Sequence, residues 1–93
     1  MTDLPDPKSP LNEMEKRVFG VDSCRHPITG YAISRAGRDS SHPAFHPNQQ
    51  AYEHLQIILR EHGEAVYQDY KRRLDEFVRA GGEVELPPVA TGV

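Results

Sequence analysis

The chain has 93 residues, a hydrophobic fraction of 37%, eight prolines and a formal net charge of −3. A chain of this length forms one small domain with a limited core, because small domains leave much of their surface in contact with water. The acidic balance argues against a general nucleic-acid binder, which would normally be basic. We therefore expect a single domain that a partner subunit or self-association would stabilise noticeably.

The sequence carries one cysteine, so no internal disulfide can form. No run of apolar residues approaches the roughly 20 needed to span a membrane. The first residues, Met-Thr-Asp-Leu-Pro-Asp-Pro, lack the basic and apolar regions of a signal peptide. We therefore expect a cytoplasmic protein that has no contact with a membrane.

The N-terminal part predicts an arm followed by a short helix. Residues 1–10 contain three prolines and no apolar period, which is typical of a disordered or extended arm. Over 11–19, apolar residues lie on one side of two helical turns, and Gly20 is a natural stop. Ser9 and Asn12 are the candidate N-caps of this helix.

Residues 20–47 are predicted to be irregular, with one short strand. Pro27 and Gly30 bracket a turn, and Tyr31–Ser34 alternates as a strand does. Glu83–Leu86 alternates in the same way. It either pairs with Tyr31–Ser34 in a minor two-stranded sheet or serves as an arm that adds to a partner's sheet.

The strongest pattern is an amphipathic stripe at helical spacing over 48–80. Gly63 lies near its middle and favours a hairpin of two helices, 48–62 and 64–80. The alternative is one continuous helix, in which this glycine would cost about 1 kcal/mol relative to alanine.

We expect a mainly α fold, in which this long helix or helical hairpin packs with the short helix 11–19. Gly81-Gly82 ends the helical part, the single domain spans 11–86, and 87–93 is a disordered tail. The predicted core consists of the apolar residues of the stripe, with either Val18 or Phe19 covering them: Leu55, Ile58, Leu59, Val66, Tyr70, Leu74 and Phe77.

A candidate zinc site lies in the irregular region. Cys24-x-His26 and His42-x3-His46 supply four sulfur or nitrogen donors in two close pairs, as structural zinc sites often do. A metal would also explain how so irregular a region stays folded. Against this interpretation, the one-residue gap of the first pair strains tetrahedral geometry. A zinc-stabilised module that contacts nucleic acid through arginines of the same loops is our alternative hypothesis.

The sequence shows no pattern that favours catalysis. Cys24 with a nearby histidine could form a thiolate nucleophile, but a lone cysteine in a small cytoplasmic protein is more often an inert core residue. No glycine-rich phosphate loop is present. We therefore expect a protein that is not an enzyme and has no resident cofactor.

Aromatic residues at the edges of the stripe are the candidate partner-binding residues, since aromatic side chains dominate protein contact surfaces. Tyr52 and Tyr67 lie where an interface and a core are equally compatible with the pattern. Arg72 and Arg73 belong to a basic cluster whose members point in different directions on a helix. We interpret this cluster as a solvated face, with contact to an acidic partner as the alternative.

Together these features favour a small non-enzymatic interaction protein, such as an accessory subunit, inhibitor or regulator from a bacterium or phage. It would bind a protein partner or a second copy of itself through an amphipathic helical face, and would not bind nucleic acid.

Overall fold

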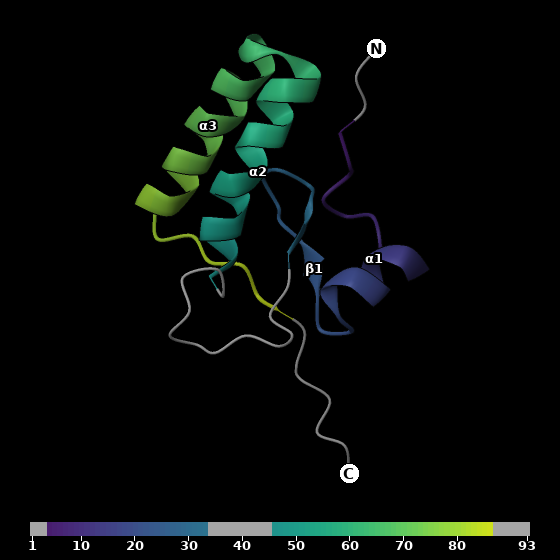
Figure 1. Ribbon diagram of the computed structural model, residues 1–93. Helices are drawn as coiled ribbons and strands as arrows, with labels where there is room; N and C mark the ends of the chain where they lie inside the picture. Colours follow the sequence, from purple (N-terminus) through teal and green to yellow (C-terminus); the bar gives the residue numbers. More distant parts are fainter. Residues whose placement is uncertain (1–3, 34–45, 87–93) are drawn as a thin grey trace.

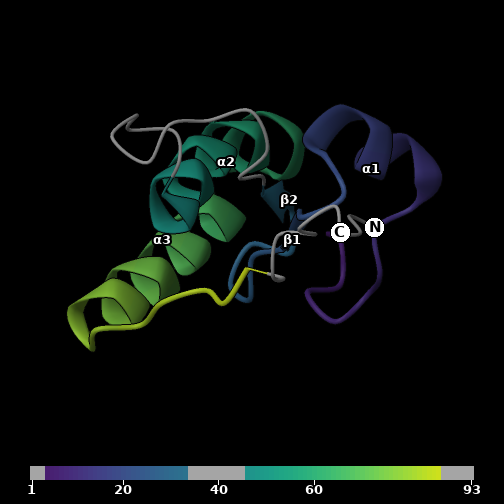
Figure 2. The same ribbon diagram turned by 90° about the horizontal axis from the view of Figure 1, so that it is seen from below.

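The computed structural model describes residues 4–33 and 46–86. In chain order these form α1 (Glu13–Phe19), β1 (Cys24–Arg25), β2 (Ala32–Ile33), α2 (Pro47–His62) and α3 (Glu64–Arg79). The last two helices pack side by side as a hairpin, and the small sheet lies between this hairpin and α1 (Figures 1 and 2). The predicted mainly α fold with a minor two-stranded sheet is confirmed.

The hairpin turns at a single residue, Gly63. Its φ of 96° and ψ of 168° lie in a region that is essentially reserved for glycine. Its N–H donates to the carbonyl of Leu59, which ends α2, and its carbonyl accepts from the N–H of Tyr67, which begins α3. The predicted break is therefore present, and a continuous helix is excluded.

Helix α3 ends at the predicted glycine pair. The N–H of Gly82 donates to the carbonyl of Phe77, and the N–H of Gly81 donates to the carbonyl of Val78. Together with the φ of 81° at Gly81, these two bonds form a Schellman motif, which satisfies carbonyls that the helix end leaves unpaired.

The sheet is a local hairpin, which differs from the pairing proposed for Glu83–Leu86. Strand β1 pairs antiparallel with β2, and the N–H of His26 donates to the carbonyl of Tyr31 to close the loop. The described residues 83–86 form no strand. Pairing between neighbouring segments wins because closing a loop of a few residues costs less conformational entropy than closing one of about fifty.

The core lies between the two long helices and the sheet. Ala51, Leu55, Ile58 and Leu74 are buried, and half-buried side chains surround them, including the predicted core members Val66, Tyr70 and Phe77. The prediction of Leu59 as a core residue is wrong, because one step along α2 from Ile58 turns its side chain outward and leaves it 37% exposed.

Helix α1 does not cover this core as predicted. Among the described residues, α1 contacts β2 and neither of the long helices. Val18 is therefore 70% exposed, and Phe19 is half-buried. The helix itself begins two residues later than predicted, because the side chain of Asn12 caps it.

The neighbours Ile58 and Leu59 provide a matched test of this core. Ile58→Ala should lower the free energy of unfolding by about 2–5 kcal/mol, because it leaves a cavity at a fully buried site. Leu59→Ala should lower it by less than about 1 kcal/mol, since this side chain already contacts solvent. Urea unfolding of both variants measures the difference, and an equal loss at the two positions would contradict the helix orientation.

Candidate functional site

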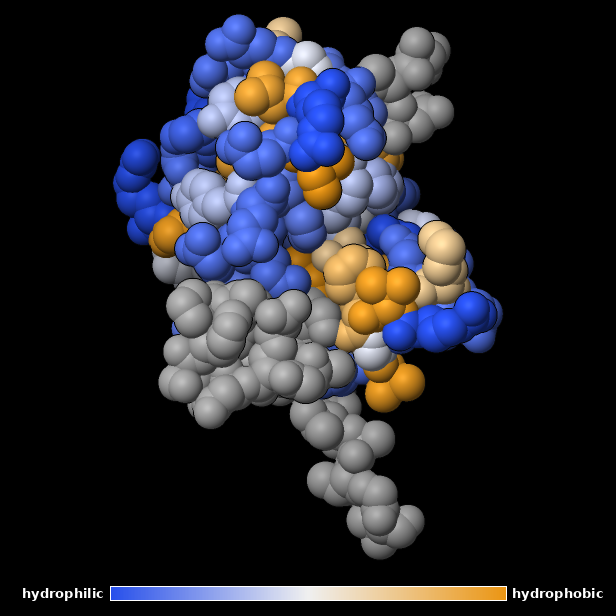
Figure 3. Space-filling view, viewed as in Figure 1, coloured by the Kyte–Doolittle hydropathy of each residue, from blue (hydrophilic) through white to orange (hydrophobic). Residues whose placement is uncertain are grey.

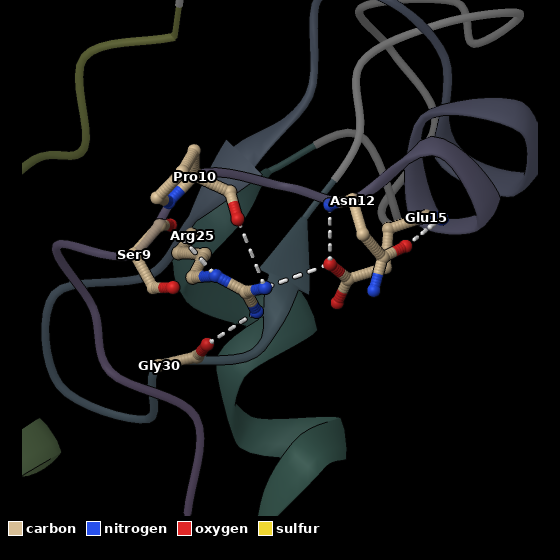
Figure 4. Close-up of polar contacts among 6 residues, drawn as sticks. All are labelled: Ser9, Pro10, Asn12, Glu15, Arg25 and Gly30. Carbon is tan, nitrogen blue, oxygen red and sulfur yellow. Dashed lines mark hydrogen bonds and ion pairs between the residues drawn. The ribbon is translucent and has the colours of Figure 1, made fainter.

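The side chain of Arg25 fixes α1 and the preceding segment to the sheet (Figure 4). Its guanidinium donates to the carbonyls of Ser9 at 2.8 Å, Gly30 at 3.1 Å and Pro10 at 3.4 Å, and to the Glu15 carboxylate at 2.7 Å. Only 8% of the Arg25 side chain is exposed. A buried guanidinium with this many partners makes a rigid junction, because a planar fork of donors has a fixed geometry.

Glu15 links this junction to the start of α1. Its Oε1 accepts from the backbone N–H of Asn12 at 3.0 Å, while the Asn12 Oδ1 accepts from the Glu15 N–H at 2.8 Å. This reciprocal pair is a capping box. Because the same carboxylate also binds Arg25, the rotation of α1 about its axis is set, with Glu15 facing the sheet.

The side of α1 that carries Met14 and Val18, next to Glu15 around the helix, is apolar and exposed. Met14 is 64% exposed, Val18 is 70% exposed, and Val21, just after the helix, is 83% exposed. We call these three residues the α1 apolar face. Hydrophobic residues gather over α1 at the right of the surface in Figure 3. Three exposed apolar side chains on one short segment make this face a candidate interaction surface.

A cavity of about 310 Å³ borders this face. Residues of three segments, 7–11, 21–25 and 84–85, line it together with Lys16 of α1, and Cys24 is among them. The sulfur of Cys24 lies 4.0 Å from the carbonyl oxygen of Glu85. A volume at the low end of the range for ligand pockets is large enough for one apolar side chain of a partner.

The predicted partner-binding tyrosines pack against the hairpin core. The hydroxyl of Tyr52 donates to Asp75 at 2.6 Å, and this bond raises the pKa of Tyr52 to about 12 and lowers that of Asp75. Tyr52 thus links α2 to α3 at Asp75, which lies eight residues, or about two helical turns, beyond Tyr67 along α3. The two tyrosines therefore contact different levels of the hairpin.

The predicted arginines lie on the outer side of α3. Arg72 and Arg73 both bind the carboxylate of Asp69, at 2.8 and 3.0 Å, and Arg72 also lies 3.5 Å from Glu76. Arg73 additionally stacks over the ring of Tyr70, 5.4 Å from its centroid. These exposed pairs fit a solvated face, and such pairs contribute little to stability.

The four candidate zinc ligands are not assembled in the described residues. Cys24 lies on β1, His46 is the exposed N-cap residue of α2, and His42 lies outside the described residues. Within 4–33 and 46–86, no group of three or more His, Cys, Asp or Glu residues could hold a metal ion. The zinc site therefore stays a prediction.

His26 has a structural role in the core. It is fully buried, its Nδ1 accepts from the backbone N–H of Ile28 at 3.1 Å, and its Nε2 lies 3.0 Å from the Asn48 Oδ1. Because a backbone N–H can only donate, the ring proton must be on Nε2. Neither nitrogen then offers a lone pair to a metal in this arrangement.

Two further histidines of α2 carry buried nitrogens. The Nδ1 atoms of His54 and His62 have no hydrogen-bond partner among the described residues. Burial, together with the nearby His26, lowers the pKa of His54 to about 4, and its ring lies 5.2 Å from that of Tyr31. His54 is therefore held neutral at the edge of the core.

Comparison with known proteins gives no relative: no protein-family model, no curated protein and no solved structure matches this chain. Among the described helices, none combines the length and apolar character that crossing a membrane requires.

Sequence patterns alone did not predict that the α1 apolar face is exposed. Helical spacing of Met14 and Val18 indicated an apolar side of this helix, but it favoured burial of that side. The pattern Asn12-x-x-Glu15 did signal a capping box, whereas nothing local connected Arg25 to Glu15.

Arg25→Gln should release α1 while the helical hairpin stays folded. The change removes the charge that pairs with Glu15 and leaves carbonyls of the arm without a donor, which weakens a largely buried junction. Hydrogen exchange should accelerate at the amides of α1 and stay slow in α2 and α3. Arg17→Gln, at an exposed position of the same helix, is the matched control. Unchanged α1 protection in Arg25→Gln would contradict the junction.

Acid should destabilise the folded protein between about pH 6.5 and pH 4. The lowered pKa of His54 means that the unfolded state binds a proton that the folded state does not. The contribution of neutral His54 to the free energy of unfolding is thus fully present above pH 6.5. Below that pH the free energy of unfolding falls by up to about 1.4 kcal/mol per pH unit. Urea unfolding at several pH values should show a flatter dependence for His54→Leu, whereas Gln56→Leu, on the exposed side of α2, should keep the wild-type slope. Equal slopes in both variants would refute this origin.

Proposed function

We propose that this chain is a non-enzymatic interaction protein, an accessory subunit, inhibitor or regulator, that binds a protein partner through the α1 apolar face. The observation that supports the proposal is the exposure of Met14, Val18 and Val21 on a segment whose orientation is held by the buried Arg25. A short helix held only by contacts of its apolar side would turn that side inward. Here a polar junction keeps the apolar side in solvent.

Rigidity of this surface supports a binding role. A helix that is already capped and anchored loses little conformational entropy when a partner covers it, so more of the contact energy contributes to affinity. The adjoining cavity makes the surface concave at this point, which favours insertion of a partner's apolar side chain.

The helical hairpin, with the sequence-predicted residues Tyr52, Tyr67, Arg72 and Arg73, is the competing location for the interface. Its polar groups are largely engaged within the chain, through Asp75 for Tyr52 and through Asp69 for both arginines. Binding there would require these bonds to be exchanged for contacts with the partner. We therefore rank the hairpin second.

Affinity capture of the tagged chain from its source cells tests the proposal. Val18→Lys places a charge on the α1 apolar face, yet should leave α1 folded, because a cation near a helix C-terminus is favourable. Recovery of the partner should fall by about tenfold or more, which corresponds to roughly 1.4 kcal/mol. Gln56→Lys adds the same charge on the exposed side of α2 and should keep wild-type recovery.

Tyr67→Ala separates the two surfaces in the same experiment. Loss of the partner in Tyr67→Ala, with normal recovery in Val18→Lys, would move the interface to α3. Normal recovery in both folded variants would reject binding through either helical face.

A further inference from the structure

We infer that the α1 apolar face binds a second copy of this chain, with the two α1 helices antiparallel about a twofold axis. This inference rests on the proposed function, since it names the partner of the same surface. Charge complementarity along α1 indicates that a second copy of the chain binds there and that its α1 runs antiparallel.

The charges that border the α1 apolar face are divided by sign. Glu13 lies in the first turn of α1 and Arg17 in the last. Their spacing of four residues places them one above the other along one side of the helix, next to Met14 and Val18. The two ends of this border therefore carry opposite charges, negative at Glu13 and positive at Arg17.

Both border charges are available for contact. The Glu13 side chain is 83% exposed, and its ion pair with Lys16 is long, at 3.9 Å. Arg17 is exposed and has no ion pair among the described residues. The other acidic residue of the first turn, Glu15, is already bound to Arg25.

An antiparallel pair of helices makes this pattern complementary to itself. Glu13 of one copy then lies opposite the partner's Arg17, and the twofold axis repeats the contact, as in any isologous interface. Met14 of each copy faces the partner's Val18 in the same arrangement. A parallel pair would instead place the Glu13–Arg17 border of each copy beside the other border of the partner helix, where these charges could not meet, so the charges select the antiparallel direction.

The size of the surface sets the expected strength. A seven-residue helix and one residue beyond it give an interface at the small end of specific protein contacts, where complexes are weak and transient. We therefore expect a dimer with a dissociation constant between about 10 μM and 1 mM.

Sedimentation equilibrium over about 10 μM to 1 mM tests self-association of the full chain. The mass of the wild type should rise with concentration from 10.5 kDa toward twice that value. Val18→Lys should remain at the monomer mass throughout, whereas Gln56→Lys should follow the wild type. A wild type that stays monomeric over the whole range overturns the inference.

A charge-complementation experiment tests the antiparallel geometry. Glu13→Arg alone places two cations opposite each other, and Arg17→Glu alone places two carboxylates opposite each other, so each variant should associate more weakly than the wild type. An equimolar mixture restores opposite charges at both contacts and should recover association. Circular dichroism confirms that each variant is folded, and a mixture no stronger than its components overturns the antiparallel pairing.

The outcomes separate this inference from the proposed function. If the wild type is monomeric while Val18→Lys still loses a different protein in affinity capture, the self-association fails and the binding role of the face stands. If Val18→Lys changes neither measurement, both fail.

Discussion

The fold depends on the buried imidazole of His26. Its Nδ1 accepts from the N–H of Ile28, its Nε2–H donates to the Asn48 side chain, and Asn48 in turn donates through Nδ2 to the carbonyl of Gly82 at 3.2 Å. The backbone N–H of Ile28 can only donate and the carbonyl of Gly82 can only accept, so these two groups set the direction of every hydrogen bond between them. The ring also lies edge-on to Phe77, with centroids 5.6 Å apart.

This network joins three segments that are distant in the sequence: the turn of the sheet, the first turn of α2 and the residues just after α3. Burying a polar ring is costly unless each nitrogen is bonded, so the three segments must keep these positions together. Burial also lowers the pKa of His26, which keeps the ring neutral. A proton on Nδ1 would face the N–H of Ile28, a second donor.

The two-stranded sheet separates the helical hairpin from α1. Successive side chains on an extended chain point to opposite sides, so His26 reaches the hairpin and Phe77 while Arg25 reaches α1 and Glu15. With the sheet in between, α1 cannot place Met14 and Val18 on the core of the hairpin. The exposed apolar face, on which the proposed binding role rests, follows from this arrangement.

Local rules in the sequence determined where the helices begin and end. Asn12 caps α1 with its side chain, Gly63 adopts a backbone conformation that other residues avoid, and Gly81 and Gly82 close α3; each depends on residues within one turn. Such features can be predicted because short-range geometry and residue type settle them. The mainly α composition followed from the same rules.

Tertiary structure alone decided which apolar residues are buried and what the polar residues do. Leu59 and Val18 satisfied the helical period as well as Ile58 did, yet only the placement of the sheet and the partner helix excluded them from the core. His26 stood in the sequence as a candidate metal ligand, and Asn48 from α2 and Gly82 after α3 gave it a structural task. These contacts join residues that are 22 or more positions apart, and neither periodicity nor spacing encodes which distant segments will meet.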